Sequence, residues 1–243
     1  MRAVLSAFAV LAASVAASPV FAQVAVPGHG VRGVGPDQLR ADFWVSRQAA
    51  PDRVILSPAE IAEQSRRMLA EDRSLNDLED LPSVLPGAQV REWVERRSQA
   101  PTRQLFDEWG DSVTAAAVAT LVDAVQLGAI PAEQPLRFAL VTRRADLRTF
   151  PTRLRVFSSP GNTDIDRWQE SALFPGTPVV IVHESRDGAW WFVVSRHYAA
   201  WVAKIHVAEG PREMVLGYAR KEPYLVVTGA KVHTVFTPER PQV

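Results

Sequence analysis

The segment "TPVVIVHESRDGAWWFVVSRHYAAWVAKIHVA", residues 177–208, decides the fold. It contains three apolar runs rich in β-branched and aromatic residues, separated by short polar stretches, a pattern typical of β-strands. Asp187-Gly188, between the first two runs, indicates a hairpin turn. Together with the earlier run "LRFALVTRR" (136–144), the segment predicts the strands of a small β-barrel.

Two adjacent tryptophans lie in the second run. Because side chains alternate along a strand, we expect Trp190, Phe192 and Val194 on one face and Trp191 and Val193 on the other. An indole carries roughly 200 Å² of surface, on the order of 5 kcal/mol if fully buried, so the ring facing away from the barrel interior requires a cover. That cover is either a neighbouring segment, such as a helical layer, or a ligand.

The region before the barrel has the periodicity of helices. "SPAEIAEQSRRMLAE" (57–71) has Ser57 at the N-cap and Pro58 at the first helical position, which predicts a helix. Trp93 and its apolar neighbours repeat at helical spacing, and Asp111 can cap a third helix. We therefore expect about three helices between the N-terminal segment and the barrel.

The N-terminus has the form of a secretory signal peptide. Arg2 precedes an apolar run that ends in small residues, and cleavage is expected after Ala22. The run is too short and too alanine-rich to span a bilayer, so we expect a periplasmic or secreted protein without a membrane span.

Charge and composition exclude several classes of function. The chain has 27 basic and 27 acidic residues, and loss of Arg2 leaves a net charge near −1, which does not favour nucleic acid as a partner. It has no cysteine, which excludes disulfides and thiolate metal sites. The five histidines match no ligand spacing, and we expect His183 and His206 to be solvated on strands. No metal or cofactor is predicted.

Two segments carry a resemblance to a known family. "VTRRADLRTFPT" (141–152) and residues 166–202 resemble the bacterial SH3-type (SH3b) domain that comes first in NlpC-type cell-wall cysteine peptidases. Ala199-Ala200 departs from the pattern, because a glycine usually precedes the tryptophan. The matching residues, which we expect to be structural, are Asp146, Arg148, Pro151, Thr152, Gln169, Gly176, Asp187, Gly188 and Trp190.

The resemblance implies the order of domains and their activity. In such peptidases a clip-like segment, two SH3-type domains and a papain-like domain follow one another, and the last cleaves γ-D-glutamyl bonds of peptidoglycan stem peptides with a cysteine and a histidine. The first SH3-type domain packs on the catalytic cleft and helps to read the free amino end of the peptide. Without a cysteine, this chain has no nucleophile for the reaction, so no catalytic residue is assigned.

We expect an α+β fold, in which an N-terminal helical segment packs on a small SH3-like β-barrel and the start of a second β module follows. The expected boundaries are a signal peptide at 1–22, an extended arm at 23–52, a helical clip-like segment at 53–135, the barrel at 136–208 and an incomplete second SH3-like module at 209–243.

Candidate ligand-binding residues follow from the implied ligand. A carboxylate beside an aromatic ring suits an ammonium group, and aromatic side chains can line a groove. Loop capping by the aspartates and core packing by the rings are the alternatives. Arg148 can bind a carboxylate or form an internal salt bridge with Asp146 or Asp166. The candidates are Asp164, Asp166, Trp168, Trp191, Tyr198 and Trp201.

Three hypotheses of function remain open. The first is the stem-peptide recognition and targeting portion of an exported NlpC-type endopeptidase, whose catalytic domain lies in cis outside this sequence. The second is a free-standing periplasmic SH3-like binding module without a hydrolase domain, which docks on peptidoglycan or on a partner hydrolase. The third is a structural adaptor whose groove is filled by its own arm.

Overall fold

The computed structural model describes residues 32–227, 235–237 and 240–241. The expected signal peptide and the start of the arm lie outside the described residues. The chain forms two compact units, residues 1–58 and 59–243. In the first unit, the described part of the expected extended arm instead contains two short helices, η1 (Pro36–Leu39) and α1 (Ala41–Val45).

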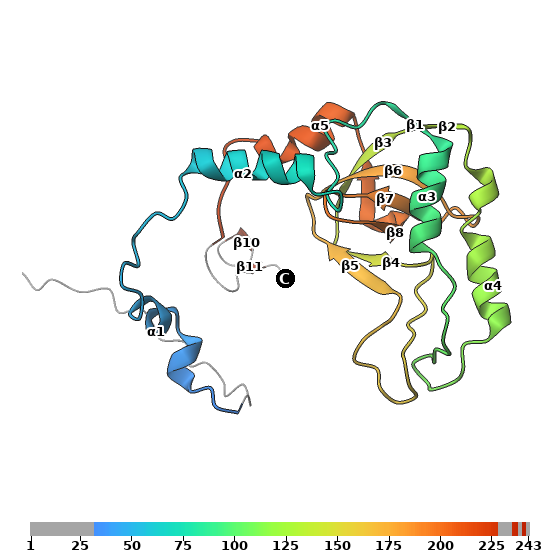
Figure 1. Cartoon of the computed structure of the whole chain (residues 1–243), viewed down its shortest axis with the longest axis horizontal. Helices are drawn as coiled ribbons and strands as arrows, with labels where there is room; N and C mark the ends of the chain where they lie inside the picture. The colour runs from blue at the N-terminus through green and yellow to red at the C-terminus, as the bar shows by residue number, and fades with distance from the viewer. Residues whose placement is uncertain (1–31, 228–234, 238–239, 242–243) are drawn as a thin grey trace, which may run out of the picture. The chain divides into compact units, whose positions relative to one another are not determined.

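The second unit contains the other described helices, apart from the first residue of α2, and all the described strands (Figure 1). The helix expected over 57–71 is confirmed, because α2 begins at Pro58. Asp111 is not the cap of the third helix. Thr114 holds that position, and its Oγ1 accepts the Ala117 N–H at 3.1 Å. The helices are α2 (Pro58–Glu71), α3 (Gly87–Arg97), α4 (Ala115–Ala124), η2 (Leu127–Ala129), η3 (Lys204–His206), α5 (Arg212–Gly217) and η4 (Tyr218–Arg220).

A seven-stranded antiparallel sheet in the order β5-β4-β8-β7-β6-β3-β9 forms the centre of this unit. The four runs named above correspond to β3, β6, β7 and β8, whereas β4 and β5 were not predicted. The strands are β3 (Arg137–Val141), β4 (Ala145–Arg148), β5 (Gln169–Leu173), β6 (Pro178–Glu184), β7 (Trp190–Val194), β8 (Ala199–Ala203) and β9 (Val207–Glu209). The fold is α+β, consistent with an SH3-like barrel.

Two antiparallel pairs lie outside this sheet. β1 (Val84–Pro86) pairs with β2 (Glu133–Pro135). β10 (Val235–Thr237) pairs with β11 (Arg240–Pro241).

The predicted alternation along β7 is confirmed, because its two faces belong to different cores. Trp190, Phe192 and Val194 pack in one core with Val90 and Val94 of α3. The neighbours Trp191 and Val193 belong to a second core built from the strands themselves. A helical layer therefore covers the face that carries Trp190, and α3 lies against the sheet (Figure 1).

His183 is not solvated, contrary to expectation. Only 7% of it is exposed, and its Nε2 lies 2.9 Å from the Val125 carbonyl oxygen, because the end of α4 covers β6. Burial lowers the pKa of His183. His206 lies in η3 rather than on a strand, with Nδ1 2.8 Å from the Arg144 carbonyl oxygen.

The residues after β9 begin with helix rather than with strand. Arg212 of α5 donates from Nη1 to the Leu81 carbonyl oxygen at 2.8 Å, and its guanidinium lies 4.8 Å from the centre of the Phe138 ring. These contacts attach α5 to the sheet and to the segment before β1. Within the described ranges, no helix has the length and hydrophobicity needed to cross a bilayer.

Candidate ligand pocket

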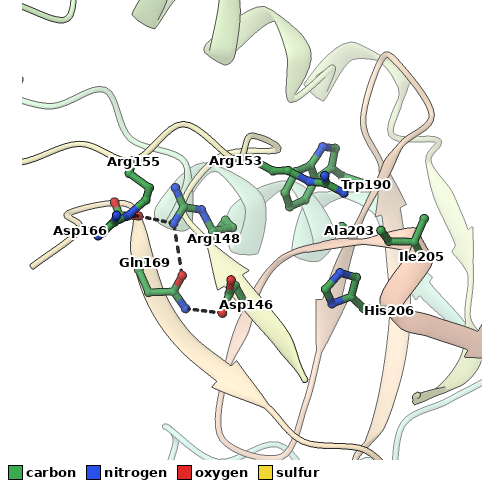
Figure 2. A pocket seen from close by; sticks show the side chains of 10 residues that line it. All are labelled: Asp146, Arg148, Arg153, Arg155, Asp166, Gln169, Trp190, Ala203, Ile205 and His206. Carbon is green, nitrogen blue, oxygen red and sulfur yellow. Dashed lines mark hydrogen bonds and ion pairs between the residues drawn. The ribbon is translucent and has the colours of Figure 1, made fainter. Parts of the chain in front are cut away.

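A pocket of about 400 Å³ lies where β4 and β5 meet the loop of residues 149–168. Figure 2 shows the polar group of Asp146, Arg148, Arg155, Asp166 and Gln169 on one side of it and Trp190, Ala203, Ile205 and His206 on the other, with Arg153 of the loop drawn next to Trp190. Its lining consists of Asp146, Arg148, Arg153, Arg155, Asp166, Gln169, Trp190, Ala203, Ile205 and His206.

Arg148 is the buried centre of the polar group. The residue is 4% exposed, and its Nη1 lies 2.5 Å from Asp166 Oδ2 and 3.2 Å from Gln169 Oε1. Nε donates to the Thr152 carbonyl oxygen, and Nη2 donates to that of Leu154. Since all three guanidinium nitrogens have partners within the chain, Arg148 holds the surrounding backbone and side chains together and is not free to bind a ligand.

Asp166 fixes the loop that borders the pocket. Its Oδ1 accepts the backbone N–H groups of Val156 at 3.2 Å and of Trp168 at 3.0 Å, while Oδ2 faces Arg148. One carboxylate therefore joins the interior of the loop at Val156 and its end at Trp168 to Arg148 of β4. The ion pair of Arg148 with Asp166 was one of the two alternatives for this arginine, and the structure contains it.

Two further arginines line the pocket with few internal partners. Arg155 Nε lies 4.0 Å from Asp166 Oδ2, and half of the Arg155 side chain is exposed. The exposed Arg153 has no ion pair with any other described residue. Asp146 is paired with Arg144 at 2.9 Å. The unpaired charge of the pocket is therefore positive.

The opposite wall is apolar. Trp190 and Ala203 form its base and are largely buried, while Ile205 is 63% exposed at its rim. The ring of His206 stands beside them (Figure 2). Such a combination of an apolar wall with a few polar groups is typical of small-ligand sites.

Part of the pocket lies in a segment that matches a known domain family. Residues 155–203 match the SH3 domain family of the SH3b1 type. The resemblance seen in the sequence is confirmed. Five residues that line the pocket belong to the matched segment, namely Arg155, Asp166, Gln169, Trp190 and Ala203.

One solved structure of similar fold is an NlpC/P60 endopeptidase from Photobacterium damselae subsp. piscicida, with a TM-score of 0.52 and 19% sequence identity. The similarity covers 70% of this chain and 40% of that one. The matched region thus spans less than half of that endopeptidase, and at this identity the likeness concerns the fold. No curated protein matches the sequence significantly.

Tyr198 also belongs to the segment that matches the SH3b1 type, but it lies outside the pocket, where β5 meets α3. Its hydroxyl donates to Glu170, and the guanidinium of Arg97 lies 4.3 Å from the centre of its ring. Arg97 also pairs with Glu170 at 2.7 Å. Burial, together with the hydrogen bond to Glu170, raises the pKa of Tyr198. Arg97 of the chain itself thus occupies the position at the Tyr198 ring where the ammonium group of a ligand was expected.

Charged side chains surround the part of the Trp191 ring that the strands do not cover. Lys204 Nζ and the Arg137 guanidinium each lie 5.1 Å from the centre of its ring, and its Nε1 donates to Glu184 Oε2 at 3.1 Å. The hydrogen bond from Lys204, followed by that from Trp191, lowers the pKa of Glu184 against the opposing effect of burial. The indole of Trp191 therefore already has contacts within the chain on its ring face and at its N–H group.

The other candidates are dispersed. Trp168 is buried against Phe150 with 5.4 Å between ring centres, and Trp201 is 0% exposed, its Nε1 donating to Ser98 Oγ at 2.9 Å. These two rings present no free face to a ligand. Asp164 is exposed on the loop, where its backbone N–H donates to Asn162 Oδ1 at 3.4 Å. Of the candidates, only Asp166 lines the pocket.

The remaining motif residues shape turns. Gly176 and Gly188 have φ of +86° and +67°, values that favour glycine, and Asp187 Oδ1 accepts the Ala189 N–H at 3.0 Å. Pro151 is buried, and Thr152 Oγ1 accepts the Leu154 N–H at 3.1 Å.

Sequence reasoning did not identify the free cations of the pocket. A signal was present, because Arg153 and Arg155 alternate directly after the "DLRTFPT" motif and an extended chain directs both to one side. Arg97 and Glu170 were also missed, because their contact joins a helix to a strand far along the chain. Among the described residues there is no group of three or more metal-ligating side chains.

Proposed function

We propose that this chain is the peptidoglycan stem-peptide recognition and targeting portion of an exported NlpC-type endopeptidase, and that it binds without cleaving. The pocket between β4, β5 and η3 carries this proposal, because it combines exposed cationic groups with an apolar wall and is lined in part by the segment that matches the SH3b1 type. A binding portion of a cell-wall-associated protein is consistent with both the family match and the NlpC/P60 fold.

The proposed organisation follows from the boundaries expected above. A signal peptide (1–22) is removed, the arm (23–52) and the clip-like segment (53–135) precede the barrel (136–208), and residues 209–243 begin a second module. Packing of α3 on the sheet supports a joint clip and barrel body. Mass spectrometry of the exported protein tests the first step, since a mature N-terminus at Gln23 is expected and an uncleaved chain would contradict it.

Binding is tested by co-sedimentation of residues 23–243 with insoluble peptidoglycan. We expect the protein in the pellet, and its release by an excess of soluble stem peptide. Glycan strands stripped of peptides serve as the control and should not retain it. Protein that stays in the supernatant, or that binds stripped glycan equally well, would overturn the proposal.

A catalytic domain in cis and a partner hydrolase make different predictions for the reading frame beyond Val243. A downstream segment with a cysteine followed by histidines supports the peptidase with its domain in cis. A stop codon directly after Val243 favours the free-standing binding or adaptor module.

A further inference from the structure

The charges around the pocket do not balance, and this imbalance specifies a ligand. Asp166 and Arg148 neutralise each other at 2.5 Å, and Asp146 is paired with Arg144 at 2.9 Å. Arg153 and Arg155 remain. Arg153 has no ion pair with any other described residue, and Arg155 has only the long contact of its Nε with Asp166 Oδ2 at 4.0 Å, so positive charge is in excess around the pocket.

Asp166 holds Arg155 only weakly. Its Oδ2 already faces Arg148, and its Oδ1 accepts two backbone N–H groups. Arg155 Nε is 4.0 Å away from that carboxylate, and its Nη2 reaches only the Thr163 carbonyl oxygen, at 3.5 Å. These distances are too long for strong hydrogen bonds, so the planar donor face of Arg155 is available to an external acceptor.

The volume of the pocket and its apolar wall limit which kind of molecule can supply the acceptor. A volume of about 400 Å³ suits a fragment of a peptide rather than a folded partner. Arginine forms bidentate hydrogen bonds with carboxylates, and the wall of Trp190, Ala203 and Ile205 fits a short aliphatic group beside the charge.

We infer that this pocket recognises a carboxylate of the stem peptide through Arg153 and Arg155, with a methyl-sized side chain of the peptide against Trp190 and Ile205. The inference rests on the proposed function and specifies its ligand. It also differs from what the family resemblance implies, which is recognition of the free amino end of the peptide.

The test compares two probes by calorimetry with residues 23–243. One is the tripeptide L-Ala-γ-D-Glu-meso-diaminopimelate with free carboxylates, and the other is the same peptide with its carboxylates amidated. We expect amidation to weaken binding at least tenfold, and binding of the free peptide to weaken further with added salt because the arginines are exposed.

Variants assign the effect to the two arginines. Arg153→Gln and Arg155→Gln should each weaken binding of the free peptide about five- to tenfold, and the double variant should bind both peptides equally. Arg155→Lys keeps the charge without the planar fork and should restore only part of the affinity. Arg196→Gln removes an exposed arginine outside the pocket and should bind as the unaltered chain does.

The outcomes separate the two proposals. Retention on peptidoglycan that is insensitive to amidation and to both arginine substitutions would overturn the carboxylate site and leave the proposed function intact. Absence of retention would overturn the proposed function. Thermal melts of each variant, which should match the unaltered chain because these side chains are exposed, exclude unfolding as the cause.

Discussion

At the scale of single residues, Arg148 shows how a candidate for ligand binding becomes part of the scaffold. Its guanidinium is enclosed and makes hydrogen bonds to a carboxylate, an amide and two backbone carbonyls. Loss of such a group leaves the Asp166 charge buried without its partner, which costs far more than loss of an exposed pair.

We predict that Arg148→Met lowers the free energy of unfolding by about 3–5 kcal/mol, measured by urea denaturation. The control is Arg66→Met, which removes an exposed ion pair with Glu63 on α2 and should cost less than about 1 kcal/mol. Equal effects of the two substitutions would show that the buried pair does not hold the loop.

Residues of this kind also mark the limit of what the sequence could predict about the site. The pairing of Arg148 with Asp166 was foreseen within one of two alternatives, an internal salt bridge as opposed to the binding of a ligand carboxylate. The availability of Arg155 was not foreseen, since it depends on the distance of 4.0 Å between its Nε and Asp166 Oδ2. The fold sets this distance, and the sequence pattern does not indicate it.

At the scale of elements, the start of α3 depends on a glycine. An added Cβ at Gly87 would lie 1.8 Å from the Pro131 carbonyl oxygen, and the Gly87 N–H donates to the Ala132 carbonyl oxygen at 2.7 Å. The atoms that the added Cβ would meet are backbone atoms of Pro131 and Ala132, so rotation of a side chain cannot relieve the clash. This close approach joins the helix to the β1-β2 pair.

We therefore expect Gly87→Ala to lower the melting temperature strongly, because relief of the clash would displace α3 from β2. Gly217→Ala provides the matched control at the end of α5, where no atom lies within 4 Å of the added Cβ; it should be neutral or stabilising by roughly 0.5–1 kcal/mol. Differential scanning calorimetry compares the two. A tolerated Gly87→Ala would contradict the close packing.

Elements with a strong apolar pattern were predictable, and polar ones were not. β6, β7 and β8 are continuous apolar runs, as expected of strands buried on both faces. β4 and β5 carry Arg148 and Gln169, whose side chains face each other and the pocket, and these polar positions interrupt the strand pattern. The N-cap of α4, Thr114, was missed because Asp111 is also able to cap and lies close by in the sequence.

At the scale of the whole molecule, the helices and the sheet are joined through groups that lie far apart in the sequence. His183 of β6 contacts the carbonyl oxygen of Val125 at the end of α4. Its burial was unpredictable because the covering helix ends 58 residues earlier in the chain.

The burial of His183 makes global stability depend on pH. Burial is the largest effect and lowers the pKa of His183 in the folded state, and Arg91 lowers it further, whereas the backbone hydrogen bonds to Val125 and Gln126 and the charge of Glu184 raise it. In the unfolded chain the pKa returns to about 6.5, so below that pH the unfolded state binds a proton that the folded state does not. Stability is therefore greatest above about pH 6.5 and falls as the pH decreases.

We predict that the melting temperature decreases between pH 7.5 and 5, and that His183→Gln, which can still donate to Val125, reduces this decrease. His197→Gln, at an exposed histidine, is the control and should keep the original profile. A decrease of the same size in His183→Gln would assign the effect to other groups.

The hydroxyl of Ser98 connects three parts of this molecule. It donates to the Thr149 carbonyl oxygen at 2.8 Å and accepts the Trp201 indole N–H at 2.9 Å, so the end of α3, the loop after β4 and strand β8 meet at one oxygen atom. A barrel excised at residue 136 for grafting onto another enzyme would leave Trp201 facing water. The autonomous building block for engineering is thus the helices and the barrel together.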